Sequence, residues 1–326
     1  MKMINVSIVG GTGYTAGELL RILLRHPQVN IESVISTTSV GKRIDSVHRD
    51  LLGETDLIYS DSFKNPDLIF LCLGHGLSRN FLEKNRLPEN CKIIDLGNDF
   101  RNQPQFGDRR FIFGLCEQFK SEIKNANYVA NPGCFATTIM LALLPLASKN
   151  MLKDDIHVHA ITGSTGAGKR PGDTTHFSYR DSNLSVYKPF THQHLEEIGN
   201  TLIKAGSTKL PQINFVPMRG DFTRGIFASI YTKWDDTMTK EEAISYFKSY
   251  YKSSPFVFVS DEPISLKEVV NTNKCLLHIE FHNGYIHITS ITDNLVKGAS
   301  GQAVQNMNLM YGLEETTGLK LKGSSF

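Results

Sequence analysis

The sequence predicts an α/β protein in which a doubly wound parallel sheet is joined to an α+β domain with a mostly antiparallel sheet. Short apolar runs alternate with helical patterns over the first hundred residues, and the first run ends in a cluster of glycines. After Asn131 the pattern changes to strands with period-two alternation. The length of 326 residues suits about two domains, at roughly 150 residues per domain.

In the first half, a strand is predicted at Ile4–Val9, where β-branched residues end abruptly at Gly10. Apolar residues at helical spacing follow from residue 18 to 24, until His26-Pro27 stops the helix. Further short apolar strands are expected along the chain at Ile31–Ser36, Leu57–Tyr59, Asp67–Leu73 and Ile93–Leu96. Strands that alternate with helices form right-handed βαβ units, so we expect a parallel sheet.

In the second half, helices are predicted at Thr138–Ala147 and Thr239–Tyr251. A last helix, between Ala299 and Leu313, closes the chain. Four strands are predicted at His157–Thr162, Gly225–Thr232, Leu276–Phe281 and Tyr285–Thr292, with a turn at residues 282–284 between the last two. Such an α+β region is typical of a substrate-binding and subunit-interface domain.

Composition excludes several classes of protein. The formal charge is only +2, which argues against a dedicated nucleic-acid binder. No stretch approaches the roughly 18 apolar residues that would span a bilayer, and no signal peptide is evident. The five cysteines are widely spaced and form no CxxC pair, so we expect free thiols in a reducing, cytoplasmic setting.

The glycines after the first strand indicate a dinucleotide site. Gly11-x-Gly13-x-x-Ala16 fits the GxGxxG/A pattern of Rossmann-type domains, and it follows a strand and opens a helix. Glycines let the backbone approach a pyrophosphate, and the helix start offers N–H donors. A tight turn that binds no ligand is the alternative. The cofactor contacts predicted in this loop are Gly10, Thr12, Gly13, Tyr14 and Thr15.

The end of the second strand indicates which dinucleotide is bound. An NAD site usually has an acidic residue there, but this chain has Ser36-Thr37-Thr38-Ser39 and then Arg43. Hydroxyl and cationic groups suit a 2′-phosphate, so NADP(H) is the predicted cofactor, with Ser36, Ser39 and Arg43 as contacts; a solvated polar loop is the alternative. Gly74, just after the strand at Asp67–Leu73, is a further candidate contact.

One cysteine stands where a thiolate would be useful. Asn131-Pro132-Gly133 makes a turn before the helix at Thr138–Ala147, which places Cys134 at or beside the helix start. The helix dipole and N–H groups there lower a thiol pKa, and the thiolate can attack an activated acyl carbon. Most cysteines are small buried hydrophobes, and that interpretation suits Cys72 and Cys275.

Two histidines could assist this nucleophile. His192 and His194 precede a helical pattern, and imidazole is the natural proton shuttle near neutral pH. The same HxH pair could hold a metal with Glu196 or Glu197, as in a metal-dependent hydrolase, or could simply lie on the surface. We favour the proton shuttle and predict no metal.

The segment Gly163–Lys169 matches most of a phosphate-binding P-loop. Its last position is Arg170, which cannot bind Mg²⁺ as a hydroxyl would, and Pro171 is poorly placed for the required helix. We therefore expect a glycine-rich loop beside the active site rather than an ATP site.

Together these motifs resemble the N-acetyl-gamma-glutamyl-phosphate reductase family of arginine biosynthesis, within a superfamily that includes aspartate-semialdehyde dehydrogenase. The resemblance covers nearly the whole chain. It is carried by the motifs at Gly10–Pro27, Asp95–Arg101, Asn131–Thr137, Gly163–Lys169, Thr191–Ile198, Thr223–Tyr231 and Asn294–Asn308. One departure is the segment Met218–Phe222, which is longer than the common pattern and leaves both Arg219 and Arg224 as possible substrate contacts.

The resemblance implies an NADP-dependent phosphorylating semialdehyde dehydrogenase. Cys134 would be the nucleophile that forms a thioester from an N-acyl-γ-glutamyl phosphate, with release of phosphate, and His192 the acid–base partner. The last helix would complete the dinucleotide domain, giving domains of 1–133 with 299–326, and of 134–298. Residues Lys297–Gln302 would lie near the nicotinamide, with Lys297, Gly298 and Gln302 as cofactor contacts.

The resemblance also bears on substrate and assembly. The predicted substrate contacts are Arg101, Asn131, Gly163, Thr165, His194, Glu197 and Arg224. A homodimer or homotetramer is expected, with no nucleic-acid or membrane partner. A related reductase acting on carrier-bound aminoadipyl phosphate or on aspartyl phosphate remains the alternative, as does an acetyl, succinyl or larger group on the substrate nitrogen.

Overall fold

The computed structural model describes residues 3–235 and 237–323, and the chain divides into two compact units. The first unit comprises Met1–Pro132 and Ala299–Lys320, and the second comprises Gly133–Gly298 with the chain from Leu321 onward. The boundary expected from sequence differs in two places. Gly133 groups with the second unit, and so does Gly323, which lies against Thr272 and the Val270 carbonyl.

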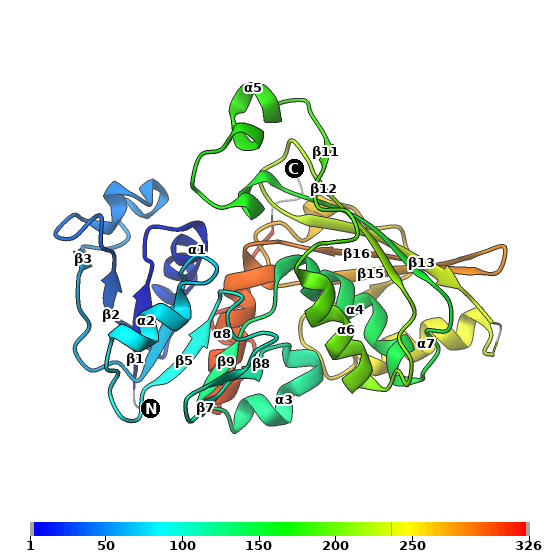
Figure 1. The fold of residues 1–326 in the computed structure, drawn as a ribbon, viewed down its shortest axis with the longest axis horizontal. Helices are drawn as coiled ribbons and strands as arrows, with labels where there is room; N and C mark the ends of the chain where they lie inside the picture. The colour runs from blue at the N-terminus through cyan, green and yellow to red at the C-terminus, as the bar shows by residue number, and fades with distance from the viewer. Residues whose placement is uncertain (1–2, 236, 324–326) are drawn as a thin grey trace. The chain divides into compact units, whose positions relative to one another are not determined.

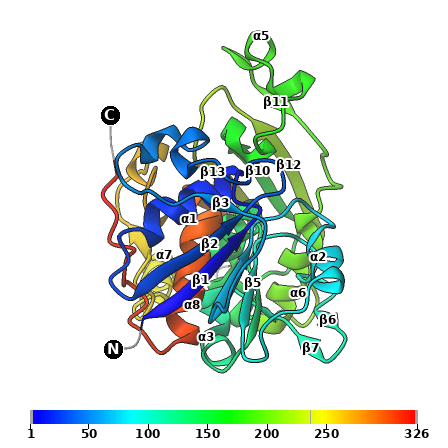
Figure 2. The same ribbon diagram turned by 90° about the vertical axis from the view of Figure 1, so that its left-hand side faces the viewer.

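The first unit is built on a seven-stranded sheet in the order β3-β2-β1-β4-β5-β9-β8, and every neighbouring pair is parallel. This confirms the predicted doubly wound sheet. The strands are β1 (Ile4–Val9), β2 (Val29–Ile35), β3 (Tyr59–Ser60), β4 (Leu68–Leu71), β5 (Lys92–Asp95), β8 (Ile112–Phe113) and β9 (Tyr128–Ala130) (Figures 1 and 2). The side hairpin of β6 (Gln105–Phe106) and β7 (Arg109–Arg110) was not anticipated.

Four α-helices accompany this sheet in the described part of the unit: α1 (Tyr14–Leu23), α2 (Ser78–Lys84), α3 (Cys116–Lys124) and α8 (Gly301–Met310). Helix α8 comes from the end of the chain, yet it contacts α1, α3 and β5 (Figure 2). All ten of its residues are buried. The C-terminal helix is therefore part of the core of the N-terminal unit.

The second unit contains a mixed seven-stranded sheet in the order β11-β12-β10-β13-β16-β15-β14. Its strands are β10 (Ile156–Thr162), β11 (Ser185–Val186), β12 (Ile213–Arg219), β13 (Ile226–Lys233), β14 (Val257–Ser260), β15 (Cys275–His282) and β16 (Tyr285–Thr292). β10 with β12 and β14 with β15 run parallel, and the other neighbours are antiparallel, as the sequence mostly predicted.

One face of this sheet is covered by α4 (Cys134–Ser148), which contacts β10, β13, β15 and β16, and also α6 (His194–Ala205) and α7 (Lys240–Tyr250). Helix α4 is buried from Phe135 to Ala147 because nearly all of its side chains are apolar. The short helix α5 (Phe177–Arg180) lies in an excursion between β10 and α6 (Figure 1). Within the described residues, no helix has the length and apolar character needed to cross a membrane.

Candidate active site

The glycine loop after β1 has the shape of a phosphate cradle. Gly10 has a φ of +83°, and a Cβ there would lie 2.5 Å from the Cys72 carbonyl oxygen, so only glycine fits. A Cβ at Gly13, by contrast, would have no neighbour nearer than the Gly10 oxygen at 3.8 Å. Helix α1 starts at Tyr14 without a side-chain cap, which leaves its first N–H groups to a ligand.

The topology places this loop at the switch point of the sheet, because β2 and β4 lie on opposite sides of β1. The open space at Gly13 and the uncapped helix start fit a dinucleotide pyrophosphate. Thr15 also helps to hold the two chain segments of the first unit together, because its carbonyl accepts a hydrogen bond of 2.8 Å from the Ser300 hydroxyl. Thr12 and Gly74 lie in the same unit.

At the end of β2, Ser36 and Ser39 are buried, whereas Arg43 is half exposed and already paired. Its guanidinium lies 2.8 Å from both Asp45 and Asp56. The hydrogen bond from Arg43 lowers the pKa of Asp45. A 2′-phosphate would therefore have to compete with two carboxylates for Arg43, and the NADP preference stays a prediction.

Cys134 is the first residue of α4, and Gly133 is its N-cap. The thiol is partly exposed, whereas Cys91, Cys116 and Cys275 are buried. Because a glycine cap has no side chain, nothing from residue 133 occupies the N–H groups at the helix start. This is the environment that stabilises a thiolate and an oxyanion beside it.

His192 lies within a cage of aromatic rings close to Cys134. Its ring centroid is 5.7 Å from that of Phe135, the residue next to Cys134, and 5.7 Å from that of Tyr187. Burial raises the pKa of Tyr187, and the charge of Cys134 raises it further, so phenol and thiol are close enough to interact. His192 is buried, and its Nδ1 accepts a 3.2 Å hydrogen bond from the His194 main-chain N–H.

The second histidine of the HxH pair lies behind the helix start. A Cβ on Gly133 would be 2.4 Å from Nε2 of His194 and 2.7 Å from Oε1 of Glu197. Glu197 accepts a 3.1 Å hydrogen bond from the Gly133 N–H. Both side chains are buried, with 3.7 Å between Nε2 and Oε1. The structure thus gives His194 and Glu197 a part in positioning the N-cap of α4, and their contact with substrate stays a prediction.

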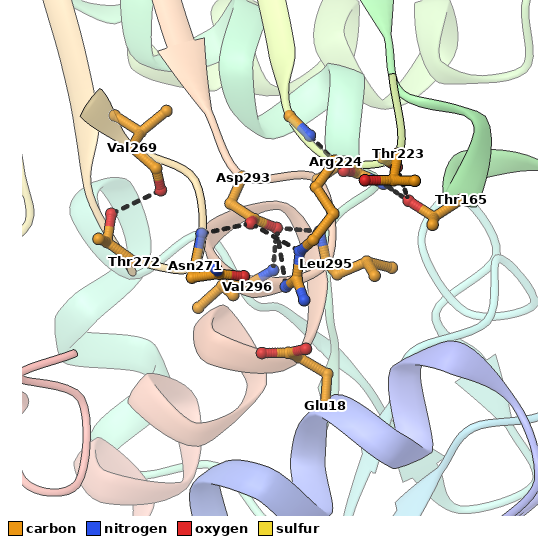
Figure 3. A network of polar contacts seen from close by, with 12 residues as sticks. Glu18, Thr165, Thr223, Arg224, Val269, Asn271, Thr272, Asp293, Leu295 and Val296 are labelled. Atoms are coloured by element: carbon orange, nitrogen blue, oxygen red, sulfur yellow. Dashed lines mark hydrogen bonds and ion pairs between the residues drawn. The ribbon is translucent and has the colours of Figure 1, made fainter. Parts of the chain in front are cut away.

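The glycine-rich segment after β10 forms a short 3-10 helix, Ser164–Ala167. Gly163 is pressed against the turn before β13, since a Cβ there would be 2.5 Å from the Thr223 oxygen. The Thr165 hydroxyl donates to that same oxygen and accepts a 3.0 Å hydrogen bond from Asn294. The loop is therefore fixed to the turn that carries Arg224 (Figure 3).

Arg224 itself is held by a carboxylate of the chain. Its Nε and Nη2 lie 3.0 and 3.3 Å from the two oxygens of Asp293 in a fork (Figure 3). Asp293 is fully buried and also accepts the main-chain N–H groups of Asn271, Leu295 and Val296. This network was not predicted, because an isolated aspartate after a strand carries no sequence signature.

Two further predicted substrate residues belong to the first unit and make structural contacts there. Arg101 donates 2.8 Å and 3.1 Å hydrogen bonds to the Asn131 and Leu96 carbonyls. The buried Asn131 side chain donates to the Ala299 carbonyl and accepts from Asn306. These bonds hold the chain where it leaves and re-enters the first unit.

The predicted cofactor residues around the start of α8 fall into two groups. Lys297 is buried in the second unit, with its amine 5.8 Å from the centre of the Phe256 ring. Gly298 packs on Cys134, since a Cβ there would be 2.8 Å from the Cys134 Cβ. Gln302, in the first unit, donates a 2.9 Å hydrogen bond to the Gly114 carbonyl.

The remaining cysteines have structural surroundings. Burial raises the pKa of Cys72 and of Cys91 to about 12. Cys116 donates to Asn306, and Cys275 lies 3.6 Å from the Ser290 hydroxyl. Across the described residues, no group of three histidine, cysteine or acidic side chains is arranged to hold a metal ion.

Comparison with known proteins identifies both units. Residues 5–126 match the semialdehyde dehydrogenase NAD binding domain, and residues 134–294 match the semialdehyde dehydrogenase dimerisation domain. The chain is 52% identical to N-acetyl-gamma-glutamyl-phosphate reductase of Christiangramia forsetii and 53% identical to that of Flavobacterium johnsoniae. Each alignment covers 99% of this chain and 100% of the relative. The chain belongs to the N-acetyl-gamma-glutamyl-phosphate reductase family.

Membership of this reductase family confirms the resemblance that the motifs carried. The fold agrees as well. Aspartate semialdehyde dehydrogenase II from Vibrio cholerae superposes with a TM-score of 0.74 at 17% identity, over 96% of this chain and 99% of that one. The sequence did not identify Tyr187 or Asp293 as residues of the candidate site. It also did not decide between Arg219 and Arg224 as substrate contacts.

Proposed function

We propose that the protein reduces an N-acyl-γ-glutamyl phosphate to the N-acyl-glutamate 5-semialdehyde with NADPH, releasing phosphate. The observation that carries the proposal is the position of Cys134, a partly exposed thiol at the uncapped start of the buried helix α4. The relatives of this chain are named N-acetyl-gamma-glutamyl-phosphate reductases, and their similarity over the full length supports the same reaction here.

In the proposed reaction, the Cys134 thiolate attacks the acyl carbon, the bond from that carbon to the phosphate oxygen breaks, and a thioester remains. The N–H groups at the start of α4 stabilise the negative charge on the acyl oxygen. When bound, NADPH supplies the hydride that reduces the acyl carbon. Breaking the carbon–sulfur bond then releases the aldehyde and restores the thiolate of Cys134.

His192 is the residue proposed to manage the proton. Because its Nδ1 accepts the His194 N–H, the neutral ring carries its proton on Nε2, and this is the proton proposed to take part in the reaction. From Nε2 the ring donates to the oxyanion and passes a proton from solvent to the departing phosphate. The aromatic cage of Phe135, Tyr187 and Phe215 holds the ring in place.

The glycine loop supports the dinucleotide. Gly10, Thr12, Gly13, Tyr14 and Thr15 are proposed to bind the pyrophosphate, since Gly13 leaves open space and α1 has no side-chain cap. The 2′-phosphate is proposed to lie near the residues that follow β2, namely Ser36, Ser39 and Arg43.

The reverse reaction provides a direct test. Wild-type protein with N-acetylglutamate semialdehyde, phosphate and NADP⁺ should produce NADPH, and Cys134→Ser should lose at least about 10³-fold in kcat while still binding NADP⁺. Cys91→Ser is the matched control, because this thiol is buried in the first unit and donates to the Lys92 carbonyl. Retained activity in Cys134→Ser would refute the covalent route, and a lower KM for NAD⁺ than for NADP⁺ would refute the cofactor assignment.

Substrate alternatives are decided in the same assay. Aspartate semialdehyde and a carrier-bound aminoadipate semialdehyde should be poorer substrates than the glutamate derivative. Activity that needs added metal and no dinucleotide would instead support a hydrolase at the HxH pair.

We also propose a homodimer or homotetramer, in a reducing compartment such as the cytoplasm that keeps the Cys134 thiol free. Residues 134–294 match a dimerisation domain, and side chains on the face of the sheet opposite α4, such as those of His159 and Tyr231, are exposed or half-buried. The mass in solution, measured by light scattering, tests the assembly, and a monomer at micromolar concentration would refute it.

A further inference from the structure

A third arginine of the predicted site region has a different environment from Arg101 and Arg224. Arg219 is the last residue of β12, and its guanidinium carbon lies 4.6 Å from the centre of the Tyr187 ring. Its Nε is buried and has no hydrogen-bond partner among the described residues. A buried donor without an acceptor is unfavourable, so its presence indicates an acceptor that arrives with a ligand.

Tyr187 connects Arg219 to the reacting groups. The Tyr187 ring lies 5.7 Å from the His192 ring. Burial raises the pKa of the Tyr187 phenol and the charge of Cys134 raises it further, whereas the charge of Arg219 and a hydrogen bond with its side chain lower it. Arg219, Tyr187, His192 and Cys134 therefore line one corner of the second unit. A substrate whose acyl carbon reaches Cys134 brings its other polar groups within reach of Arg219.

The main chain of Arg219 is fixed on several sides. Its carbonyl accepts a hydrogen bond from the buried Arg180, which also donates to the Gly220 carbonyl and to the Ser185 hydroxyl at 2.7 Å. Ser185 pairs with Arg219 across β11 and β12, and Gly220 donates 3.0 Å to the Thr162 carbonyl. Arg180 is thus a positioning residue, and the guanidinium of Arg219 extends from a rigid backbone.

We propose that Arg219 binds a carboxylate of the substrate. The proposal rests on the proposed function and names the residue that sets its specificity. A guanidinium offers parallel N–H donors that match a carboxylate, and the glutamyl substrate carries one on its α-carbon. A second carboxylate is present when the acyl group on nitrogen is succinyl rather than acetyl. Either would give Nε its acceptor.

The test compares aldehydes that differ in the number of their carboxylates. N-acetylglutamate semialdehyde carries one, N-succinylglutamate semialdehyde carries two, and 4-acetamidobutanal is the same chain without any. We expect Arg219→Gln to raise KM about 10- to 100-fold for a carboxylate-bearing aldehyde, with little change in kcat. The rate with 4-acetamidobutanal should be the same in variant and wild type. The KM of Arg219→Lys for a carboxylate-bearing aldehyde should lie between those of the wild type and Arg219→Gln, because lysine keeps the positive charge but lacks the parallel N–H donors.

The outcomes separate the possible sources of the carboxylate. A raised KM for both carboxylate substrates assigns the α-carboxylate, and a raised KM for the succinyl substrate alone assigns the carboxylate of the acyl group. An equal loss on all three aldehydes, or a change only in the KM for phosphate, overturns the proposal. Arg86→Gln, an exposed arginine of the first unit, is the matched control.

Controls separate failure of this proposal from failure of the proposed function and from misfolding. An inactive wild type would refute the proposed function and leave no KM for Arg219 to change, so the two failures are distinguishable. Circular dichroism and the melting temperature establish that Arg219→Gln is folded. Arg180→Lys should reproduce part of the KM effect if it acts by positioning Arg219, whereas an unchanged KM in folded Arg180→Lys would refute that role.

Discussion

Gly298→Ala tests directly how tightly Cys134, the proposed nucleophile, is packed. A Cβ at residue 298 would lie 2.8 Å from the Cys134 Cβ, 3.2 Å from the Cys134 Cα and 3.2 Å from the Asp293 carbonyl oxygen. Ordinary contact begins at 3.4 Å, so the closest pair is short by 3.4 minus 2.8, or 0.6 Å. Because all three neighbours are backbone atoms or the Cβ of Cys134, no flexible side chain can move aside.

The size of the effect follows from that overlap. Inserting a methyl group into a packed site destabilises by about 1–3 kcal/mol, which lowers the melting temperature by several degrees. Displacing a reacting group by about 1 Å lowers a rate roughly 100-fold, so a shift near half that size should lower kcat by roughly 10-fold. We therefore expect a folded protein with a slower chemical step.

Two measurements separate this effect from loss of cofactor binding. The first is kcat with N-acetylglutamate semialdehyde, phosphate and NADP⁺, and the second is the rate of Cys134 alkylation by iodoacetamide without cofactor. Both should fall in Gly298→Ala. Gly172→Ala is the control, because its Cβ would meet nothing nearer than 3.8 Å and its φ of −157° suits any residue. Wild-type kcat and alkylation in folded Gly298→Ala would refute the reasoning.

Two further predictions concern stability. Asp293→Asn removes the charge that pairs with the mostly buried Arg224, so unfolding should need about 3 kcal/mol less, or roughly 6–12 °C in melting temperature; an unchanged melting temperature would contradict the network. Burial raises the pKa of Asp95 from 3.8 to about 6. The folded state therefore holds this proton more tightly than the unfolded chain, and stability is lost as pH rises from about 4 to about 6. Relative to Asp95→Asn, the free energy of unfolding of the wild type should fall by about 3 kcal/mol over that pH range. Melting temperatures that change with pH in the same way in both proteins would contradict this prediction.

Sequence patterns were sufficient for the features that local chemistry dictates. The β-branched run at Ile4–Val9 and the glycines after it predicted β1 and the start of α1, because strand alternation and the demands of a tight turn are both local. The Pro132-Gly133 turn likewise placed Cys134 at a helix start, since glycine at an N-cap and an apolar run after it are adjacent in the chain.

The environment of each candidate side chain was not predictable in this way. Arg224 and Arg219 are five residues apart in a segment that the sequence does not distinguish, yet one is held by a fully buried carboxylate from residue 293 and the other has a buried Nε without a partner. The parallel strand pairs of the second sheet were not predictable either. The register in which β14 pairs with β15, for example, depends on the whole sheet. These features follow from contacts between distant segments, which periodicity does not encode.

The geometry at Gly133 explains how a helix start can serve a thiolate while a carboxylate lies beside it. Glu197 accepts the Gly133 N–H at 3.1 Å, and its charge alone would disfavour a second negative charge at Cys134. His194 Nε2 lies 3.7 Å from Oε1 of Glu197 and offsets that charge when it is protonated. Both groups come within 2.7 Å of where a Cβ on residue 133 would be, so glycine is required there for packing as much as for the turn. In the proposed mechanism the two histidines of the HxH motif therefore have different roles: His192 manages the proton, and His194 packs against the N-cap of the helix that begins at Cys134.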